Sequence, residues 1–131
     1  MKYFTIEELS RSDTARKEGI DNTPSDAAAR NLTALVDNVL DPLREWYGKP
    51  VHINSGYRNS ETNRLVGGVA DSYHLKGMAA DIDMGGKADN QPLFDYIREH
   101  LPFTELGWEG GGRWIHVAYD PDHLDKEVFF A

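Results

Sequence analysis

Residues 72–81 read Ser-Tyr-His-Leu-Lys-Gly-Met-Ala-Ala-Asp, and we interpret the rest of the chain outward from them. This stretch places the imidazole of His74 and the carboxylate of Asp81 seven residues apart. Two ligands on neighbouring turns of one helix would lie about three or four residues apart, so this spacing does not suit a helix. We expect a loop that carries His74, a turn at Gly77, and a strand that carries Asp81.

A third candidate ligand, His116, lies in the run Trp-Ile-His-Val-Ala-Tyr at residues 114–119. This alternation of β-branched and aromatic residues is typical of a strand. On such a strand Trp114 shares the face of His116, while Ile115, Val117 and Tyr119 pack on the other side. Two histidines and one aspartate, with a fourth position open to water, are typical of a catalytic zinc site, whose bound water has a pKa of about 7.

Each of these side chains also has an ordinary structural interpretation. A histidine in a strand is commonly buried and hydrogen-bonded with no role as a ligand. Asp81 is harder to explain in that way, because it lies between apolar neighbours. A buried carboxylate costs several kcal/mol unless it is paired or binds a metal.

The composition narrows the function classes. The chain has no cysteine, which excludes disulfides, thiolate ligands and a cysteine nucleophile, so nitrogen and oxygen must hold any metal. The net charge of −8 argues against nucleic acid and anionic membranes as partners. The length of 131 residues suits one domain, residues 1–131, and we expect a monomer.

No targeting or membrane segment is recognisable. No apolar run approaches the length of a membrane span. The first residues, Met1–Glu8, contain acids where a signal peptide needs an apolar stretch, so we expect no secretion signal. The chain is therefore expected either to work in the cytoplasm or to leave it by a route that the sequence does not show.

The periodicity of the chain predicts an α+β fold with helices in its N-terminal part packed on a small antiparallel sheet. Its longest helix is expected to begin after Ser25, carry one apolar stripe, kink or restart at Pro42 and end at Gly48 and Pro50. The other expected elements are short helices from Ile6, from Ser12 or Asp13, and from Asn59 or Ser60; a helix from Asp89 or Asn90; and strands at 51–54, 79–84, 104–108, 113–119 and 128–130.

Several motifs occur together in an order that resembles a known family. They are Ser55-Gly56-Tyr57-Arg58, Asn63, Val66-Gly67-Gly68, Ser72-x-His74-x-x-Gly77-x-Ala79-x-Asp81 and Trp114-Ile115-His116-Val117. Over roughly residues 20 to 120 the chain resembles the zinc D-alanyl-D-alanine carboxypeptidase-like family, which includes murein peptidases and phage endolysins. The resemblance implies a Hedgehog/DD-peptidase-like fold. Together with the lack of a secretion signal, it is compatible with synthesis in the cytoplasm and release to the cell wall, as for a phage lysis enzyme.

The resemblance also implies roles for individual residues. His74, Asp81 and His116 match the zinc ligands of the family. Arg58 matches an arginine that contacts the substrate carbonyl or carboxylate, and its charged planar fork suits the developing oxyanion; the alternative is a surface ion pair. Ser72 matches a position near the substrate, although a hydroxyl that caps the loop is the alternative. We also assign Trp114 to substrate binding.

The general base departs from the family pattern. Many members place a glutamate three residues before the second histidine, where this chain has Arg113. Glu109, at the end of the preceding strand, is our candidate base, because a hairpin would return it toward His116. Glu105 is the second candidate, and we expect Asp83 to orient a metal ligand. The alternative for Glu109 is an ordinary solvated acid in a glycine turn.

These assignments predict a zinc-dependent metallopeptidase that acts on the stem peptides of bacterial peptidoglycan. The nucleophile would be a zinc-bound water, and the type of reaction would be that of a D,D-carboxypeptidase or an endopeptidase. The alternative is a non-catalytic, zinc-stabilised domain of the same fold that binds peptidoglycan or protein. A third interpretation is a structural component without metal.

Overall fold

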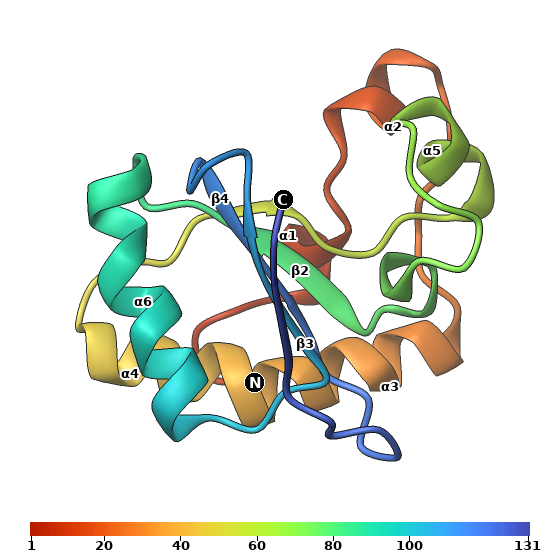
Figure 1. The fold of residues 1–131 in the computed structure, drawn as a ribbon. Helices are drawn as coiled ribbons and strands as arrows, with labels where there is room; N and C mark the ends of the chain where they lie inside the picture. The colour runs from red at the N-terminus through yellow and green to blue at the C-terminus, as the bar shows by residue number, and fades with distance from the viewer.

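A five-stranded sheet forms the centre of the computed structural model, which describes residues 1–131 (Figure 1). The expected α+β class is confirmed. The sheet order is β1-β2-β4-β3-β5, and every neighbouring pair is antiparallel except β3 and β5. The strands are β1 (Ile53–Ser55), β2 (Ala79–Ile82), β3 (Glu105–Glu109), β4 (Trp114–Ala118) and β5 (Glu127–Phe130).

The parallel pairing at one edge follows from the path of the chain after β4. The last residue of β4, Ala118, pairs with the first residue of β3, Glu105. The loop 119–126 stays at this end of the sheet, so β5 also begins there, with Glu127 opposite Glu105. Two strands that start at the same end run in the same direction, and the predicted edge strand is therefore parallel to β3.

The predicted N-terminal boundaries of four helices are confirmed by their capping hydrogen bonds. The hydroxyl of Ser12 and the amide of Asn59 each accept the backbone N–H expected of an N-cap, as do Thr5 and Ser25. The helices are α1 (Ile6–Ser10), α2 (Asp13–Lys17), α3 (Asp26–Leu35), η1 (Val36–Leu40), α4 (Asp41–Tyr47), α5 (Ser60–Leu65), η2 (Tyr73–Lys76) and α6 (Lys87–His100).

The long helix passes through Pro42 without a break. Segments α3, η1 and α4 follow one another directly, and η1 is a π-helical turn. A proline lacks an N–H and its ring clashes with the carbonyl four residues earlier. The wider turn just before Pro42 accommodates both effects. The kink or restart expected at Pro42 therefore takes the form of a local widening of the helix.

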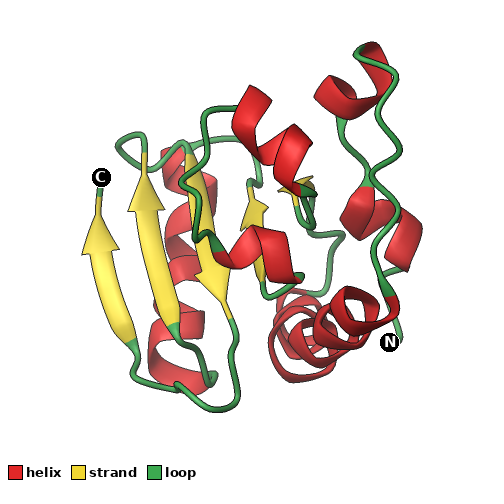
Figure 2. Ribbon diagram, turned by 90° about the vertical axis from the view of Figure 1, so that its right-hand side faces the viewer, coloured by secondary structure: helices red, strands yellow, loops and turns green.

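The helices divide around the sheet (Figure 2). Helix α6 packs on β3 and β4, while η2 adjoins β2 and α3. One cluster of 21 buried residues fills the space between the long helix, α6 and the sheet, with Leu35, Leu40, Ile82, Leu93 and Ile115 fully buried. No helix is both long and apolar enough to span a membrane.

Gly77 joins η2 to β2 and fixes the approach of the long helix. Its φ of +73° lies in the left-handed region, and a Cβ atom at this position would lie 2.5 Å from the carbonyl oxygen of Ala28 in α3. Glycine is therefore required twice, once by the backbone angle and once by the close contact. Because η2 carries His74, this contact also sets the height of that imidazole above the sheet.

We expect Gly77→Ala to lower the free energy of unfolding by roughly 3 kcal/mol, since the methyl group adds a clash with backbone to the strain of a left-handed alanine. Gly19→Ala is the matched control. Gly19 has a φ of +69° but nothing within 4 Å of a Cβ. It should lose only about 1 kcal/mol. Urea unfolding of both variants measures the difference, and equal losses would contradict the role of the Ala28 contact.

Candidate metal centre

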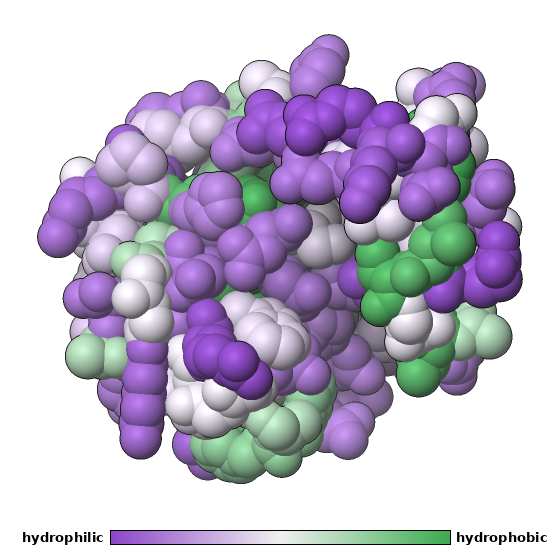
Figure 3. Space-filling view, turned by 90° about the horizontal axis from the view of Figure 1, so that it is seen from above, coloured by the Kyte–Doolittle hydropathy of each residue, from purple (hydrophilic) through white to green (hydrophobic).

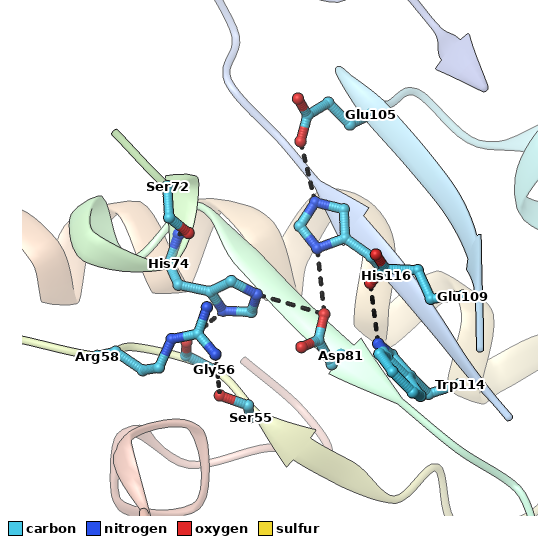
Figure 4. A network of polar contacts seen from close by, with 10 residues as sticks. All are labelled: Ser55, Gly56, Arg58, Ser72, His74, Asp81, Glu105, Glu109, Trp114 and His116. Carbon is cyan, nitrogen blue, oxygen red and sulfur yellow. Dashed lines mark hydrogen bonds and ion pairs between the residues drawn. The ribbon is translucent and has the colours of Figure 1, made fainter. Parts of the chain in front are cut away.

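Three side chains from three separate segments meet on one face of the sheet (Figure 4). His74 comes from η2, Asp81 from β2 and His116 from β4, and one ligand atom of each lies within 4.8 Å of the others. Asp81 Oδ1 lies 3.3 Å from His74 Nε2 and 3.1 Å from His116 Nδ1. The pairing of β2 with β4 places Asp81 directly opposite His116, so the sheet register creates this part of the site.

His74 is oriented by the chain that follows β1. Its Nδ1–H donates to the carbonyl oxygen of Gly56 at 2.6 Å, and the N–H of Arg58 donates to the carbonyl oxygen of His74 at 3.1 Å. The first bond places the ring proton on Nδ1, which leaves the Nε2 lone pair directed at Asp81. Gly56 lies so close to the carbonyl of Leu9 that a side chain would not fit there.

His116 is oriented by a carboxylate on the neighbouring strand. Its Nε2–H donates to Glu105 Oε1 at 2.9 Å, which leaves Nδ1 toward Asp81. Asp83, which was expected to orient a ligand, does not do so. The Asp83 carboxylate accepts hydrogen bonds from the N–H groups of Gly85 and Gly86 and from the amide of Asn90.

The turn at Asp83 also explains why α6 begins earlier than expected. The Asp83 carboxylate closes the glycine turn, and Asn90 Oδ1 accepts the N–H of Met84. With these groups satisfied, the helix begins at Lys87 after Gly86. The acidic residue after β2 therefore supports the start of α6 and takes no part in the cluster.

The donor set fits a divalent cation. Two imidazole lone pairs and one carboxylate oxygen face a common point, and such acceptors repel one another unless a proton or a cation lies between them. Two neutral imidazoles and one carboxylate suit zinc in ligand type, and they leave a fourth position. His74 and His116 each donate their other ring N–H to an oxygen, as metal-binding histidines do.

The charges of the cluster couple strongly. Burial alone would raise the pKa of the Asp81 carboxyl, but its interactions with the His116 and His74 rings outweigh burial and hold the pKa well below its usual range. Burial alone would lower the pKa of His116, but its bonds to Asp81 and Glu105 raise it to about 9. In the metal-free protein a proton on His116 Nδ1 thus takes the place of the cation.

The cluster lies in a cleft of about 670 Å³. Apart from Asp83, every site residue named from the sequence lines this cleft: Arg58, Ser72, His74, Asp81, Glu105, Glu109, Trp114 and His116. The cleft also includes Tyr73, Lys76 and Phe129, which no sequence motif indicated. Seen from above, this face is mostly hydrophilic, with an apolar patch over α5 and the loop that follows it, where Leu65, Val66 and Val69 are exposed (Figure 3).

Arg58 keeps donors available to a ligand. Its Nη1 reaches only Ser55 Oγ, at 3.5 Å, and its Nε is buried without a hydrogen-bond partner. Burial lowers the pKa of the guanidinium, while the negative charges of Asp81 and Glu109 act to raise it. The structure shows no salt bridge for this side chain, so the alternative of a surface ion pair is wrong.

Ser72 and Glu109 both line the cleft, and each accepts a hydrogen bond from a neighbouring residue. Ser72 Oγ accepts the N–H of His74, so it caps η2 as the alternative expected, and it also lines the cleft. Glu109 pairs with Trp114 across the hairpin, and its Oε2 accepts the indole N–H at 2.9 Å. Glu109 is thus held at the edge of the cleft rather than left as a free acid in the turn.

The structure therefore places a buried cluster that could hold a metal ion in a polar cleft, and the comparison with known proteins places the chain in a family. Residues 2–118 match the model of the peptidase M15 family, and the chain belongs to this family. It is 34% identical over 119 residues to the zinc D-Ala-D-Ala carboxypeptidase of Streptomyces albus G. This match covers 88% of the chain but 45% of that relative, so the chain spans less than half of the relative's length.

We expect the metal-free protein to lose stability as the pH rises from about 6.5 to about 9. The folded state raises the pKa of His116 from 6.5 to about 9, so its contribution is complete below pH 6.5 and disappears toward pH 9. The loss should reach about 3 kcal/mol. Urea unfolding in chelator across this range measures it. His116→Gln is the control, and parallel curves for both proteins would refute the assignment.

Proposed function

We propose that this chain is a zinc-dependent peptidase that hydrolyses peptide bonds in bacterial peptidoglycan, of D,D-carboxypeptidase or endopeptidase type. The observation that carries the proposal is the convergence of His74 Nε2, Asp81 Oδ1 and His116 Nδ1 within 4.8 Å in an open cleft. Membership of the peptidase M15 family and the name of the Streptomyces relative support zinc as the metal and a D-alanyl peptide as the substrate.

The three converging side chains would hold the zinc. When bound, zinc would supply a Lewis acid that polarises the scissile carbonyl and lowers the pKa of water. Asp81 contributes the one negative charge of the ligand set, and Gly56 and Glu105 keep the two imidazoles in their binding orientation. Glu105 bonds the ring nitrogen of His116 that points away from Asp81, so its role is to position the ligand.

Arg58 would bind the oxygen on which negative charge develops. It lies beside His74, on the side of the cluster opposite Glu105 (Figure 4). Its terminal Nη groups form only the long contact to Ser55 Oγ, so they can meet the carbonyl oxygen in the transition state or a terminal carboxylate in the ground state. Either contact places the scissile bond between Arg58 and the zinc ligands.

Glu109 would act as the general base. Its Oε2 accepts the Trp114 indole N–H, which leaves the other oxygen free to take a proton from the attacking water. The same carboxyl can then deliver that proton to the amine that leaves as the peptide bond breaks. Trp114 thereby gains a definite part in the proposal, since it orients the base in addition to forming the wall of the cleft.

A non-catalytic, zinc-stabilised domain that binds peptidoglycan is the second candidate. The observation that favours it is Arg113, at the position where many members of the family carry the glutamate base. Its Nε donates to the carbonyl oxygen of Gly110, and its side chain does not line the cleft. If Glu109 does not replace that base, the zinc site would serve stability and binding alone.

Zinc-loaded protein should release peptide fragments from purified peptidoglycan, whereas chelator-treated protein and His116→Ala should release none, because the metal is held by that imidazole. Mass analysis of the digest identifies the bond cut, and elemental analysis gives the zinc content. His52→Ala, which removes an exposed histidine outside the cleft, is the control. Cleavage that persists in chelator, or none by zinc-loaded protein, would overturn the proposal.

Two glutamine substitutions separate the roles of the carboxylates. Glu109→Gln should lower kcat by about 100-fold or more with zinc content retained, because the base is lost. Glu105→Gln should instead weaken zinc binding by about 10- to 100-fold, because the acceptor of the His116 Nε2–H loses its negative charge. Zinc titration and kinetics on one muropeptide measure both. Full activity of zinc-loaded Glu109→Gln would contradict the role of the base, and unchanged zinc affinity of Glu105→Gln would contradict the positioning role. Binding without turnover by the parent protein would favour the second candidate.

A further inference from the structure

The edge strand β5 brings an aromatic residue to the metal cluster. Phe129 lies beyond residues 2–118, the part of the chain that matches the family model. In the sheet, Asp81 pairs with His116, His116 with Gly107, and Gly107 with Phe129. These four residues form one row across the neighbouring strands β2, β4, β3 and β5. Phe129 therefore lies in the same row of the sheet as the candidate ligands Asp81 and His116.

Gly107 makes room for the aromatic ring. A Cβ atom at Gly107 would lie 2.6 Å from Phe129 Cε2, which no real contact allows. The ring of Phe129 therefore lies over the glycine and approaches His116, with 5.9 Å between the ring centroids and an angle of 46° between the planes. The side chain is half-buried and lines the cleft together with Glu105 and His116.

The next residue provides a contrast on the same strand. Phe130 points to the other face of the sheet, where its ring lies 5.9 Å from that of Phe94, and it remains 66% exposed. It does not line the cleft. One strand thus places one phenylalanine at the cluster and one away from it, so the two positions can be compared directly.

We propose that Phe129 is a specificity-determining residue that contacts an apolar side chain of the substrate next to the scissile bond. The inference rests on the proposed peptidase function and deepens it. Arg58 lies beside His74 at one side of the cluster, and Glu105 bonds to His116 at the other (Figure 4). The ring of Phe129 adds an apolar surface beside His116 and lines the same cleft. A peptide bound between them presents the side chain of one flanking residue to this ring.

The chemistry of this wall favours an uncharged, apolar side chain. The ring offers apolar contact area to a methyl group. Glu105 lies two residues before Gly107 on β3 and lines the same cleft, and its carboxylate disfavours an anionic side chain. An alanyl residue satisfies both conditions. A glycyl residue would lose the contact of one methyl group, which is worth about a fourfold change in kcat/KM or more.

The test compares Phe129→Ala with Phe130→Ala on matched peptides. The substrate is the muropeptide that the parent protein cleaves, and two analogues carry glycine in place of one or the other residue flanking the cut bond. The parent protein and Phe130→Ala should prefer the natural peptide over one analogue by about fourfold or more. Phe129→Ala should reduce the ratio of kcat/KM on the natural peptide to kcat/KM on that analogue to about one, with zinc content unchanged. Gly107→Ala, which displaces the ring, should also lower this ratio.

A binding measurement keeps this test independent of turnover. Calorimetry of zinc-loaded Glu109→Gln with a synthetic stem pentapeptide ending in D-Ala-D-Ala gives Kd, and adding Phe129→Ala should weaken it several-fold more than adding Phe130→Ala. If the parent protein cleaves and both phenylalanine variants keep the same peptide preference and the same Kd, the inference fails while the proposed function stands. If Phe129→Ala loses activity equally on all peptides and also loses zinc, the inference is overturned, because the ring would then only cover the cluster.

If the parent protein binds the peptide without cleaving it, the proposed function fails, and the Kd values alone decide the role of Phe129. If the parent protein neither binds nor cleaves the peptide, the proposed function and the inference both fail.

Discussion

The meeting of two imidazoles on one carboxylate oxygen is the constraint on which this structure depends. His74 and His116 both reach Asp81 Oδ1, and both direct their other ring nitrogen to a fixed oxygen. Such a cluster is stable only with positive charge at its centre, supplied by a proton in the metal-free protein or by a cation. The low pKa of Asp81 and the raised pKa of His116 are two expressions of that one requirement.

The scaffold meets this constraint through close backbone contacts. Gly56 packs against the carbonyl of Leu9 and Gly77 against that of Ala28, so α1 and α3 approach the segments that carry and orient His74. Both helices also contribute to the buried cluster of apolar residues. Interiors packed to this density transmit small displacements, and a methyl group at either glycine would move an imidazole that must stay within reach of Asp81.

The sheet provides the other half of the site and extends it. Strands β2 and β4 supply Asp81 and His116, and β3 adds Glu105 and Glu109 on the same face. Beside them, β5 places Phe129 against the His116 ring. The cluster is thus bordered by a guanidinium on one side and by two carboxylates and an aromatic ring on the other, which gives the cleft different chemistry at its two ends.

The sequence by itself determined the ligand types, the helix caps and the alternation of strands, because each depends on residues close together in the chain. The spacing of His74 and Asp81 and the strand pattern around His116 were enough to name the candidate ligands. Only the tertiary structure decided which carboxylate orients His116, since Asp83 and Glu105 look equally suitable in sequence and differ in what the strand pairing brings near them. It also decided the parallel docking of β5 and hence the place of Phe129. Register and pairing between distant segments follow from packing of the whole core, and no local pattern carries that information.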